Sequence, residues 1–189
     1  MKKILFFIHQ MMYGGAEKVL VNLVNNMDSN KYDITVMTLF DVGVNKEFLL
    51  PKIKYKSVFK RLFKGNTTLL KFFPPQFLYK YLIQDEYDVV VSYLEGSCTR
   101  IVGGAPKDIK KIAWVHIDLS QGHWTSMVFN KSLEKEKECY KRFNDIIFVS
   151  NSAKDGFKKL FGDDFNNPQV KYNTIIAGDV IKKSQEYES

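Results

Sequence analysis

Apolar and polar positions along the chain follow two periodicities in turn. Continuous apolar runs predict buried strands over residues 3–9 and 33–40, and helical spacing of apolar residues predicts a one-faced helix from Ala16 to Met27 between them. Shorter apolar runs predict further strands over residues 87–93, 111–117, 145–150 and 169–176. Because strands and helices alternate, we expect an α/β fold, a Rossmann-like doubly wound and mostly parallel sheet.

Residues 51–84 are less regular. Pro74 and Pro75 divide two short helical candidates. Past the prolines, one apolar face is predicted from Phe77, Leu78, Tyr81 and Leu82.

The end of the chain carries clear helix signals. Ser152 with Asp155 is a capping-box arrangement that predicts a helix start, and Gly162 predicts its end. The last residues are polar. We therefore expect one domain over residues 1–174, and residues 175–189 to begin a linker to a further, C-terminal domain.

Composition narrows the class of protein. The 189 residues are 45% hydrophobic, which suits one domain with a real core. The apolar stretch after Met1 is too short for a signal peptide, and no run approaches the roughly 20 residues that span a bilayer. Cys98 and Cys139 stand far apart, outside any CxxC pattern, so we expect reduced, buried thiols in a cytoplasmic protein and no metal site.

The net charge of +7 is concentrated in one window. Residues 51–84 hold eight basic and no acidic residues, interleaved with eight aromatic ones. This mixture favours contact with an anionic membrane surface, slightly ahead of a solvated basic face over an aromatic core. Single-stranded nucleic acid, which uses the same residue types, ranks well below both. The predicted membrane-contact residues are Lys60, Arg61, Lys64, Lys71 and Lys80.

A pair of glycines, Gly14 and Gly15, lies between the first predicted strand and its helix. Glycines there let the backbone approach a ligand, and the free N–H groups of the helix start suit a phosphate. The alternative is a tight turn that needs a positive φ. The pattern is neither GxGxxG nor a P-loop, so dinucleotide binding, and with it an oxidoreductase, gains little support.

Polar residues follow two of the later predicted strands. His116 comes at a strand's carboxyl end, where open α/β sheets place ligands, and could stabilise charge on a leaving group. The alternative for His116 is a ring bonded to nearby backbone, although its position favours function. Asp118 could orient a ring or accept from a hydroxyl group. Glu95 could bind acceptor hydroxyl groups, and a solvated loop charge explains it equally well. His123 and Trp124 could line the same cleft or simply pack in their loop.

Taken in order, these motifs resemble those of a known family. The segments KILFFIH…YGGAEKVLVNLVNNM, YDVVVSYLEG, KIAWVHID, IIFVSNSAKDGF and KYNTII are similar to the N-terminal domain of family-4 glycosyltransferases of the GT-B architecture. The match covers nearly the whole chain. Asn173 matches the asparagine of the family's YNP segment, whereas Thr174 replaces its proline.

The resemblance implies two Rossmann-like domains, of which this one faces the acceptor and a missing C-terminal one binds the sugar nucleotide. It implies retaining, metal-free transfer from a UDP- or GDP-linked sugar. By the same resemblance, Gly14 and Gly15 face the donor diphosphate, His116 lies beside the transferred sugar, and Glu95 and Asp118 loosely match acceptor-side positions. The paired glutamates of the family's EX7E motif belong to the second domain, so we expect this polypeptide alone to be inactive.

The functional hypothesis is therefore the acceptor domain of a bacterial glycosyltransferase. Its acceptor would be a glycan or lipid-linked sugar of cell-surface polysaccharide or glycolipid synthesis, reached at the inner face of the plasma membrane. The partners that it implies are the sugar acceptor and the enzyme's own C-terminal domain. The alternative is a Rossmann-type nucleotide- or nucleic-acid-binding module without transferase activity.

Overall fold

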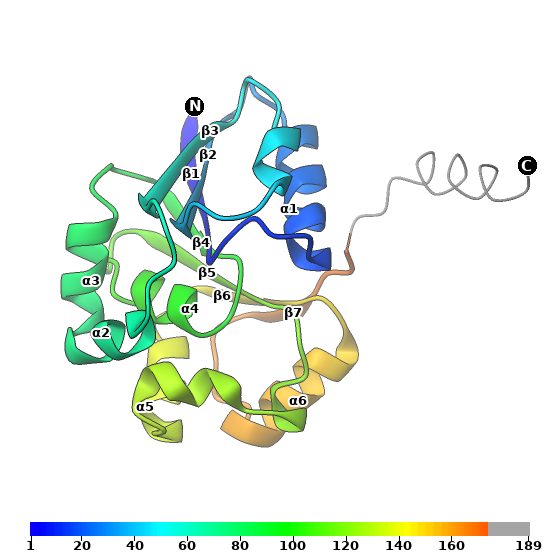
Figure 1. The fold of residues 1–189 in the computed structure, drawn as a ribbon. Helices are drawn as coiled ribbons and strands as arrows, with labels where there is room; N and C mark the ends of the chain where they lie inside the picture. The colour runs from blue at the N-terminus through cyan, green and yellow to red at the C-terminus, as the bar shows by residue number, and fades with distance from the viewer. Residues whose placement is uncertain (174–189) are drawn as a thin grey trace, which may run out of the picture.

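The computed structural model describes residues 1–173, in which seven strands form one sheet (Figure 1). The strands are β1 (Lys2–Ile8), β2 (Tyr32–Phe40), β3 (Lys54–Phe59), β4 (Val89–Ser92), β5 (Lys110–Val115), β6 (Asp145–Phe148) and β7 (Pro168–Val170). Their order is β3-β2-β1-β4-β5-β6-β7, and every pair is parallel. The predicted α/β, doubly wound fold is confirmed, while the predicted linker, residues 175–189, lies outside the described residues.

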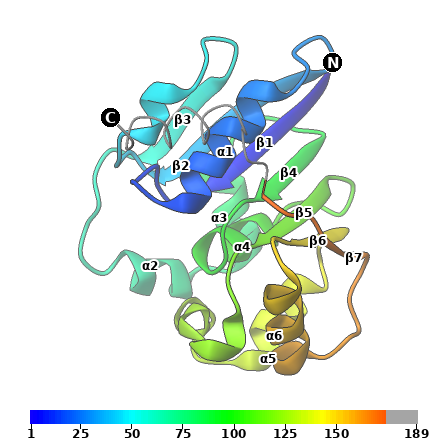
Figure 2. The same ribbon diagram turned by 90° about the vertical axis from the view of Figure 1, so that its right-hand side faces the viewer.

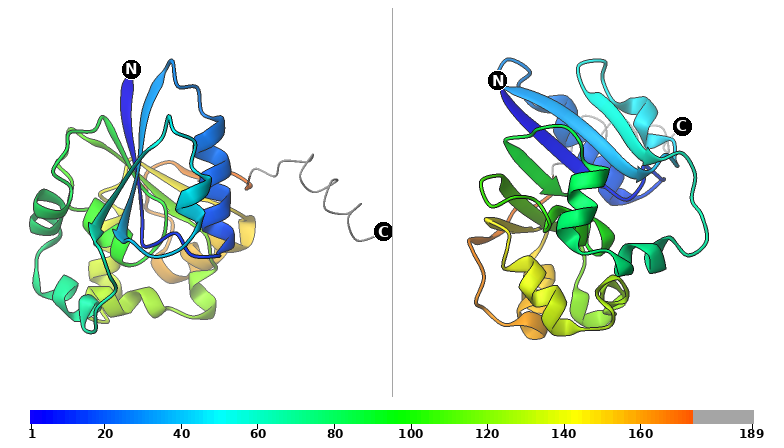
Figure 3. Two further views of the ribbon diagram at one scale, coloured as in Figure 1. Left: turned by 45° about the horizontal axis from the view of Figure 1, so that its top comes forward. Right: turned by 90° about the vertical axis from the view of Figure 1, so that its left-hand side faces the viewer.

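Helices cover both faces of this sheet (Figures 2 and 3). They are α1 (Gly15–Asn26), α2 (Asn66–Phe72), α3 (Pro75–Leu82), α4 (Ser97–Val102), α5 (Leu133–Tyr140) and α6 (Asn151–Phe161), with 3-10 turns η1 (Asn45–Phe48), η2 (Leu119–Gln121) and η3 (Trp124–Phe129). Successive residues of β1 point to opposite faces: Ile4 and Phe6 join α1 in one core, whereas Leu5 and Phe7 join α3 to α6 in the other.

Strand β3 was not predicted. It pairs with β2 at the edge of the sheet, and its side chains alternate between exposed lysines and half-buried residues. Lys54 forms an ion pair with Asp33 (2.7 Å) and Lys56 with Asp85 (2.5 Å). Charged side chains are a common protection of an edge strand against pairing with other chains. In the sequence, those lysines merge with the basic window, which concealed the strand.

The start of α6 also differs from the prediction. Its N-cap is Ser150, whose Oγ accepts a hydrogen bond from the backbone N–H of Ala153 (3.1 Å), so Ser152 already lies inside the helix. Gly162 ends the helix as predicted.

Cys98 and Cys139 are buried free thiols, which confirms this part of the cysteine prediction. In the part of the chain that the structure describes, no helix has the length and apolar character needed to cross a bilayer.

Substitution of Gly104, which follows α4, tests how closely this part of the chain packs against α3. A Cβ at this buried position would overlap the carbonyl of Pro75, in the first turn of α3. We expect Gly104→Ala to lower the free energy of unfolding by about 2 kcal/mol, because backbone would have to move. Gly122→Ala is the matched control, since a Cβ there meets nothing within 4 Å. Urea unfolding followed by circular dichroism compares them, and equal losses for both variants would contradict this packing.

Candidate functional site

The sheet reverses its winding between β1 and β4. These strands are neighbours, but β1 leads to α1 on one face and β4 leads to α4 on the other. In open α/β sheets, ligands bind at the carboxyl ends of the strands beside such a reversal. The loops that follow β1, β4 and β5 are therefore the place to look for a site.

The loop after β1 is held in place by the loop after β2. Met11 donates its N–H to the carbonyl of Val42 (2.9 Å), and the Asn45 side chain donates to the carbonyl of Met12. Gly43 has a φ of 104° and lies so close to Met11 that a Cβ would overlap its carbonyl. Sequence reasoning missed Gly43 and Asn45, because neither forms a motif with the residues beside it.

The glycine pair begins α1, but not through a positive φ. Gly14 has a φ of −100° and is extended, so the alternative of a tight turn that needs a positive φ is wrong. Gly14 is needed for space, since a Cβ would overlap the carboxylate of Glu17. Gly15 is exposed, and a Cβ there would meet nothing within 4 Å, so a ligand could approach its backbone. Phosphate binding by Gly14 and Gly15 stays a prediction.

Glu17 is a residue of this turn that the sequence did not single out. Its side chain is buried in the first turn of α1, and burial raises the pKa of its carboxyl, against a backbone hydrogen bond that lowers it. The amino end of a helix favours negative charge. An ionised Glu17 and a bound phosphate would therefore compete for the same positive end of α1.

His116 follows β5 directly and lies in an aromatic cluster with two neighbours. Its ring centroid is 4.8 Å from that of Tyr93 and 6.5 Å from that of Trp114. Burial lowers the pKa of His116 to about 4, against a hydrogen bond with the Tyr93 backbone that raises it, so the ring is neutral at neutral pH.

This aromatic cluster contains three polar atoms that lack partners. Among the described residues, Tyr93 Oη, Trp114 Nε1 and His116 Nε2 are buried and accept or donate no hydrogen bond. Buried polar groups in native proteins are nearly always paired, so each such group calls for an explanation. Three of them together at the carboxyl edge mark this cluster as the candidate site.

Glu95 joins the loop after β4 to the loop after β5. Its Oε1 accepts hydrogen bonds from the backbone N–H groups of His116 and Ile117, the latter at 3.1 Å. Only 4% of the residue is exposed, and burial raises the pKa of its carboxyl despite these bonds. Glu95 thus lies beside His116, and its carboxylate holds the histidine's backbone rather than facing solvent, so the alternative of a solvated loop charge is wrong.

Asp118 has a local structural role. Its Oδ1 accepts hydrogen bonds from the backbone N–H (2.9 Å) and the hydroxyl (2.7 Å) of Ser120, and these bonds lower the pKa of its carboxyl. The carboxylate packs against Gly156 of α6, where a Cβ would overlap it. The structure therefore brings Glu95 to His116 and turns Asp118 toward α6.

The loop residues His123 and Trp124 separate in the structure. His123 Nε2 lies 2.7 Å from Glu136 Oε2 and packs among the helices. Trp124 is 53% exposed and lies against Gly96, next to the Glu95 loop. Trp124 is thus the one of the two that borders the candidate site.

Behind this edge lies a second buried acid that sequence reasoning missed. Glu136 of α5 is fully buried, and burial raises the pKa of its carboxyl, while His123 and Thr125 lower it. The charge of Glu136 in turn raises the pKa of Glu95. The two acids are therefore electrostatically linked within the interior.

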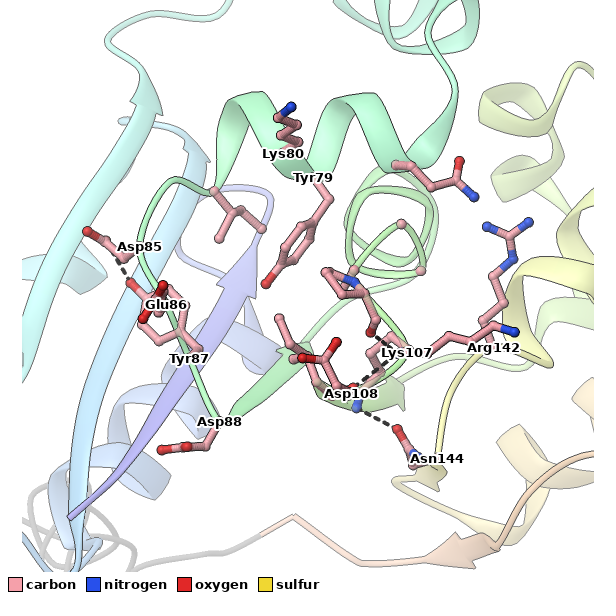
Figure 4. Close-up of a pocket in the computed structure, with 18 of the residues that line it drawn as sticks. Tyr79, Lys80, Asp85, Glu86, Tyr87, Asp88, Lys107, Asp108, Arg142 and Asn144 are labelled. Carbon is pink, nitrogen blue, oxygen red and sulfur yellow. Dashed lines mark hydrogen bonds between the residues drawn. The ribbon is translucent and has the colours of Figure 1, made fainter.

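A wide hollow lies elsewhere, at the amino-terminal edge of the sheet (Figure 4). Its volume is about 1630 Å³, and Tyr79 of α3 points into it. Lys111 Nζ, on the same wall, donates to the carbonyls of Pro106 (2.7 Å) and Ile109 (3.0 Å), so it serves to hold the preceding loop. We place the site at the carboxyl edge instead, because the unpartnered cluster and the glycine turn lie there.

The lowered pKa of His116 has a consequence for stability. Because the unfolded histidine has an ordinary pKa of 6.5 and the folded one about 4, the unfolded chain binds the proton more tightly. Stability is lost as pH falls from about 6.5 to 4. The His116→Gln variant lacks this titrating group. The free energy of unfolding of the wild type, minus that of the variant, should therefore decrease by up to about 3 kcal/mol between neutral pH and pH 4. Urea unfolding across this range measures it, and parallel profiles would contradict it.

Comparison with known proteins places the chain in a family. The sequence matches the family Glycosyltransferase Family 4 over residues 13–176, which is most of its length and includes the glycine turn, Glu95 and His116. A search of curated proteins finds no match. The chain belongs to glycosyltransferase family 4.

Proposed function

We propose that this chain is the acceptor-side domain of a retaining glycosyltransferase. It would help to move a sugar from a nucleotide-sugar donor to a glycan or lipid-linked acceptor of the cell surface. One observation carries the proposal: within residues 1–173, the polar atoms of Tyr93, Trp114 and His116 lie buried without hydrogen-bond partners beside the reversal point of the sheet. Each unmet group costs about 1–3 kcal/mol, which hydrogen bonds to a bound sugar would recover.

The chemistry of these residues suits sugar transfer. A neutral His116 can exchange hydrogen bonds with a hydroxyl group of the transferred sugar without adding charge to the site. The exposed backbone at Gly15 leaves room for the donor diphosphate, and positioning together with electrostatic stabilisation of that leaving group would supply much of the rate. Glu95 acts here as a positioning residue for the His116 backbone.

Family membership favours this proposal over a Rossmann-type binding module without transferase activity. By the same reasoning, the donor nucleotide is held by a second, C-terminal domain across a cleft. UDP- and GDP-linked sugars are the donors to test first, with no metal added.

Removal of single polar atoms tests the site. In the intact two-domain enzyme, we expect His116→Gln to lower kcat/KM about 100-fold and Tyr93→Phe about tenfold, because both lose hydrogen bonds to the reacting sugar. Tyr79→Phe is the matched control, since it deletes another buried, unpartnered hydroxyl far from the site. The measurement is release of nucleoside diphosphate from UDP- and GDP-linked sugars, with a membrane lipid extract as acceptor. Equal effects of Tyr93→Phe and Tyr79→Phe would argue against the assigned site.

A separate experiment tests whether turnover requires a donor-binding domain. The 189-residue chain alone should release no nucleoside diphosphate from the same sugars, whereas a polypeptide that continues into a donor-binding domain should do so. Turnover by the chain alone would refute the requirement for a donor-binding domain, but it would be consistent with the proposed transferase activity. Inactivity of both proteins with every donor would count against the transferase proposal itself.

A further inference from the structure

The basic window divides into two groups in the structure. The cations on and before β3 have partners: Lys52 donates to the carbonyl of Met27 (3.1 Å), and Lys54 and Lys56 form the ion pairs with Asp33 and Asp85. The second group consists of the cations of residues 60–81, and this stretch of the chain is here called the docking segment. Among the described residues, no carboxylate lies within ion-pair distance of Lys60, Arg61, Lys64, Lys71 or Lys80.

The aromatic residues of the window also divide into inward-facing and exposed ones, although the division does not follow the bounds of the docking segment. Phe59 stacks on Phe40 in the interior, and Tyr79 is buried. In the docking segment, Phe72 is 80% exposed. The predicted shared face of α3 is therefore wrong in part, because Phe77 and Tyr81 are exposed while Leu78 enters the core.

The exposed rings of Phe77 and Tyr81, on α3, and of Phe73, before it, form a row of contacts. The centroids of Phe73 and Phe77 are 4.9 Å apart, and those of Phe77 and Tyr81 are 4.2 Å apart. Because Phe77 lies between its two neighbours, its ring faces are not open to stacked bases. Single-stranded nucleic acid stacks its bases on free ring faces, so Phe77 offers it no such platform.

Arg100 of α4 holds the docking segment to the rest of the domain. Its buried guanidinium donates to the carbonyls of Leu70 (3.2 Å), Lys71 (3.3 Å) and Phe73 (2.8 Å) at the end of α2. It also lies 5.8 Å from the centroid of the Phe129 ring. The segment is therefore presented by a fixed support, which lowers the entropy lost on binding.

Beside this support is a hollow of about 400 Å³, between the α2–α3 turn and α5. Its lining includes four cationic side chains, Lys71, Arg100, Lys135 and Arg142, and one carboxylate, Glu138. Phe72 and Phe73 form part of its wall. The excess of positive charge beside aromatic rings matches a phosphate that is attached to an apolar chain.

We propose that the docking segment binds an anionic phospholipid membrane, with a lipid phosphate in the α2–α5 hollow and the exposed rings at the interface. The inference does not rest on the transferase reaction, since binding requires no turnover. Each cation near an anionic surface contributes about fivefold to partitioning, or about 1 kcal/mol, before screening by salt.

Vesicle flotation of the chain tests this proposal. We expect strong recovery with vesicles of phosphatidylcholine and phosphatidylglycerol, little with phosphatidylcholine alone, and loss of recovery at high salt. The fourfold variant K60Q/R61Q/K64Q/K71Q should lower the partition coefficient about 100-fold. The matched control K2Q/K18Q/K31Q/K159Q removes the same charge from exposed sites elsewhere and should retain most of the recovery.

Two further test variants, one of them with a matched control, distinguish the contributions of the exposed rings and of the hollow to membrane binding from the contribution of net charge. Phe72→Ser should reduce recovery about tenfold, because the ring leaves the interface, whereas Phe48→Ser, at another exposed phenylalanine (62%), should not. R142Q should reduce the preference for phosphatidylglycerol. Phe72, Phe48 and Arg142 are exposed, so circular dichroism should show that these variants are folded.

The proposal is overturned by equal recovery on neutral and anionic vesicles, or by equal losses in the two fourfold variants. Salt-sensitive binding of a single-stranded oligonucleotide without vesicle recovery would also overturn it, in favour of a nucleic-acid surface.

Discussion

The parallel pairing of β1 with β4 is the constraint on which the candidate site depends. Ile4 to Phe7 pair with Val89 to Ser92, and the ladder continues as Tyr93 donates its N–H to the carbonyl of Phe7 (2.9 Å). This bond extends strand geometry to the aromatic cluster itself. The loop that leads to the glycine turn and the Tyr93 ring therefore leave neighbouring strands of one ladder, although about 80 residues separate Gly14 from Tyr93 in sequence.

Beyond this ladder, buried acids organise the edge of the sheet. Glu95 forms charge-assisted bonds to two backbone N–H groups, which compensate part of the cost of burying a carboxylate. Glu136 lies close enough to raise the pKa of Glu95, so the interior holds two acids whose ionisation opposes each other. Glu95 thus fixes the backbone at His116, while the polar atoms of the aromatic cluster have no hydrogen-bond partner in the described part of the chain.

Much of this fold could be predicted from sequence because buried parallel strands leave uninterrupted apolar runs, as β1 and β2 do. Strand β3 could not, since an edge strand needs charged side chains, and its lysines resembled the basic stretch around them. His116 could be located because its position follows a strand end. The roles of Glu95, Glu17 and Glu136 depend on contacts across 13 to 22 residues or on a side chain folded back on its own helix, and no local pattern encodes such contacts.

The short helix α4 connects two parts of the molecule that have been described separately. Its N-cap is Gly96, directly after Glu95, and its fourth residue is Arg100, whose guanidinium holds the end of α2. At 1.5 Å per residue, six helical residues span only about 9 Å, too short to bend appreciably. The end of α2 and the loop that carries Glu95 are therefore both tied to this one helix, so the outer surface and the candidate site share one short support.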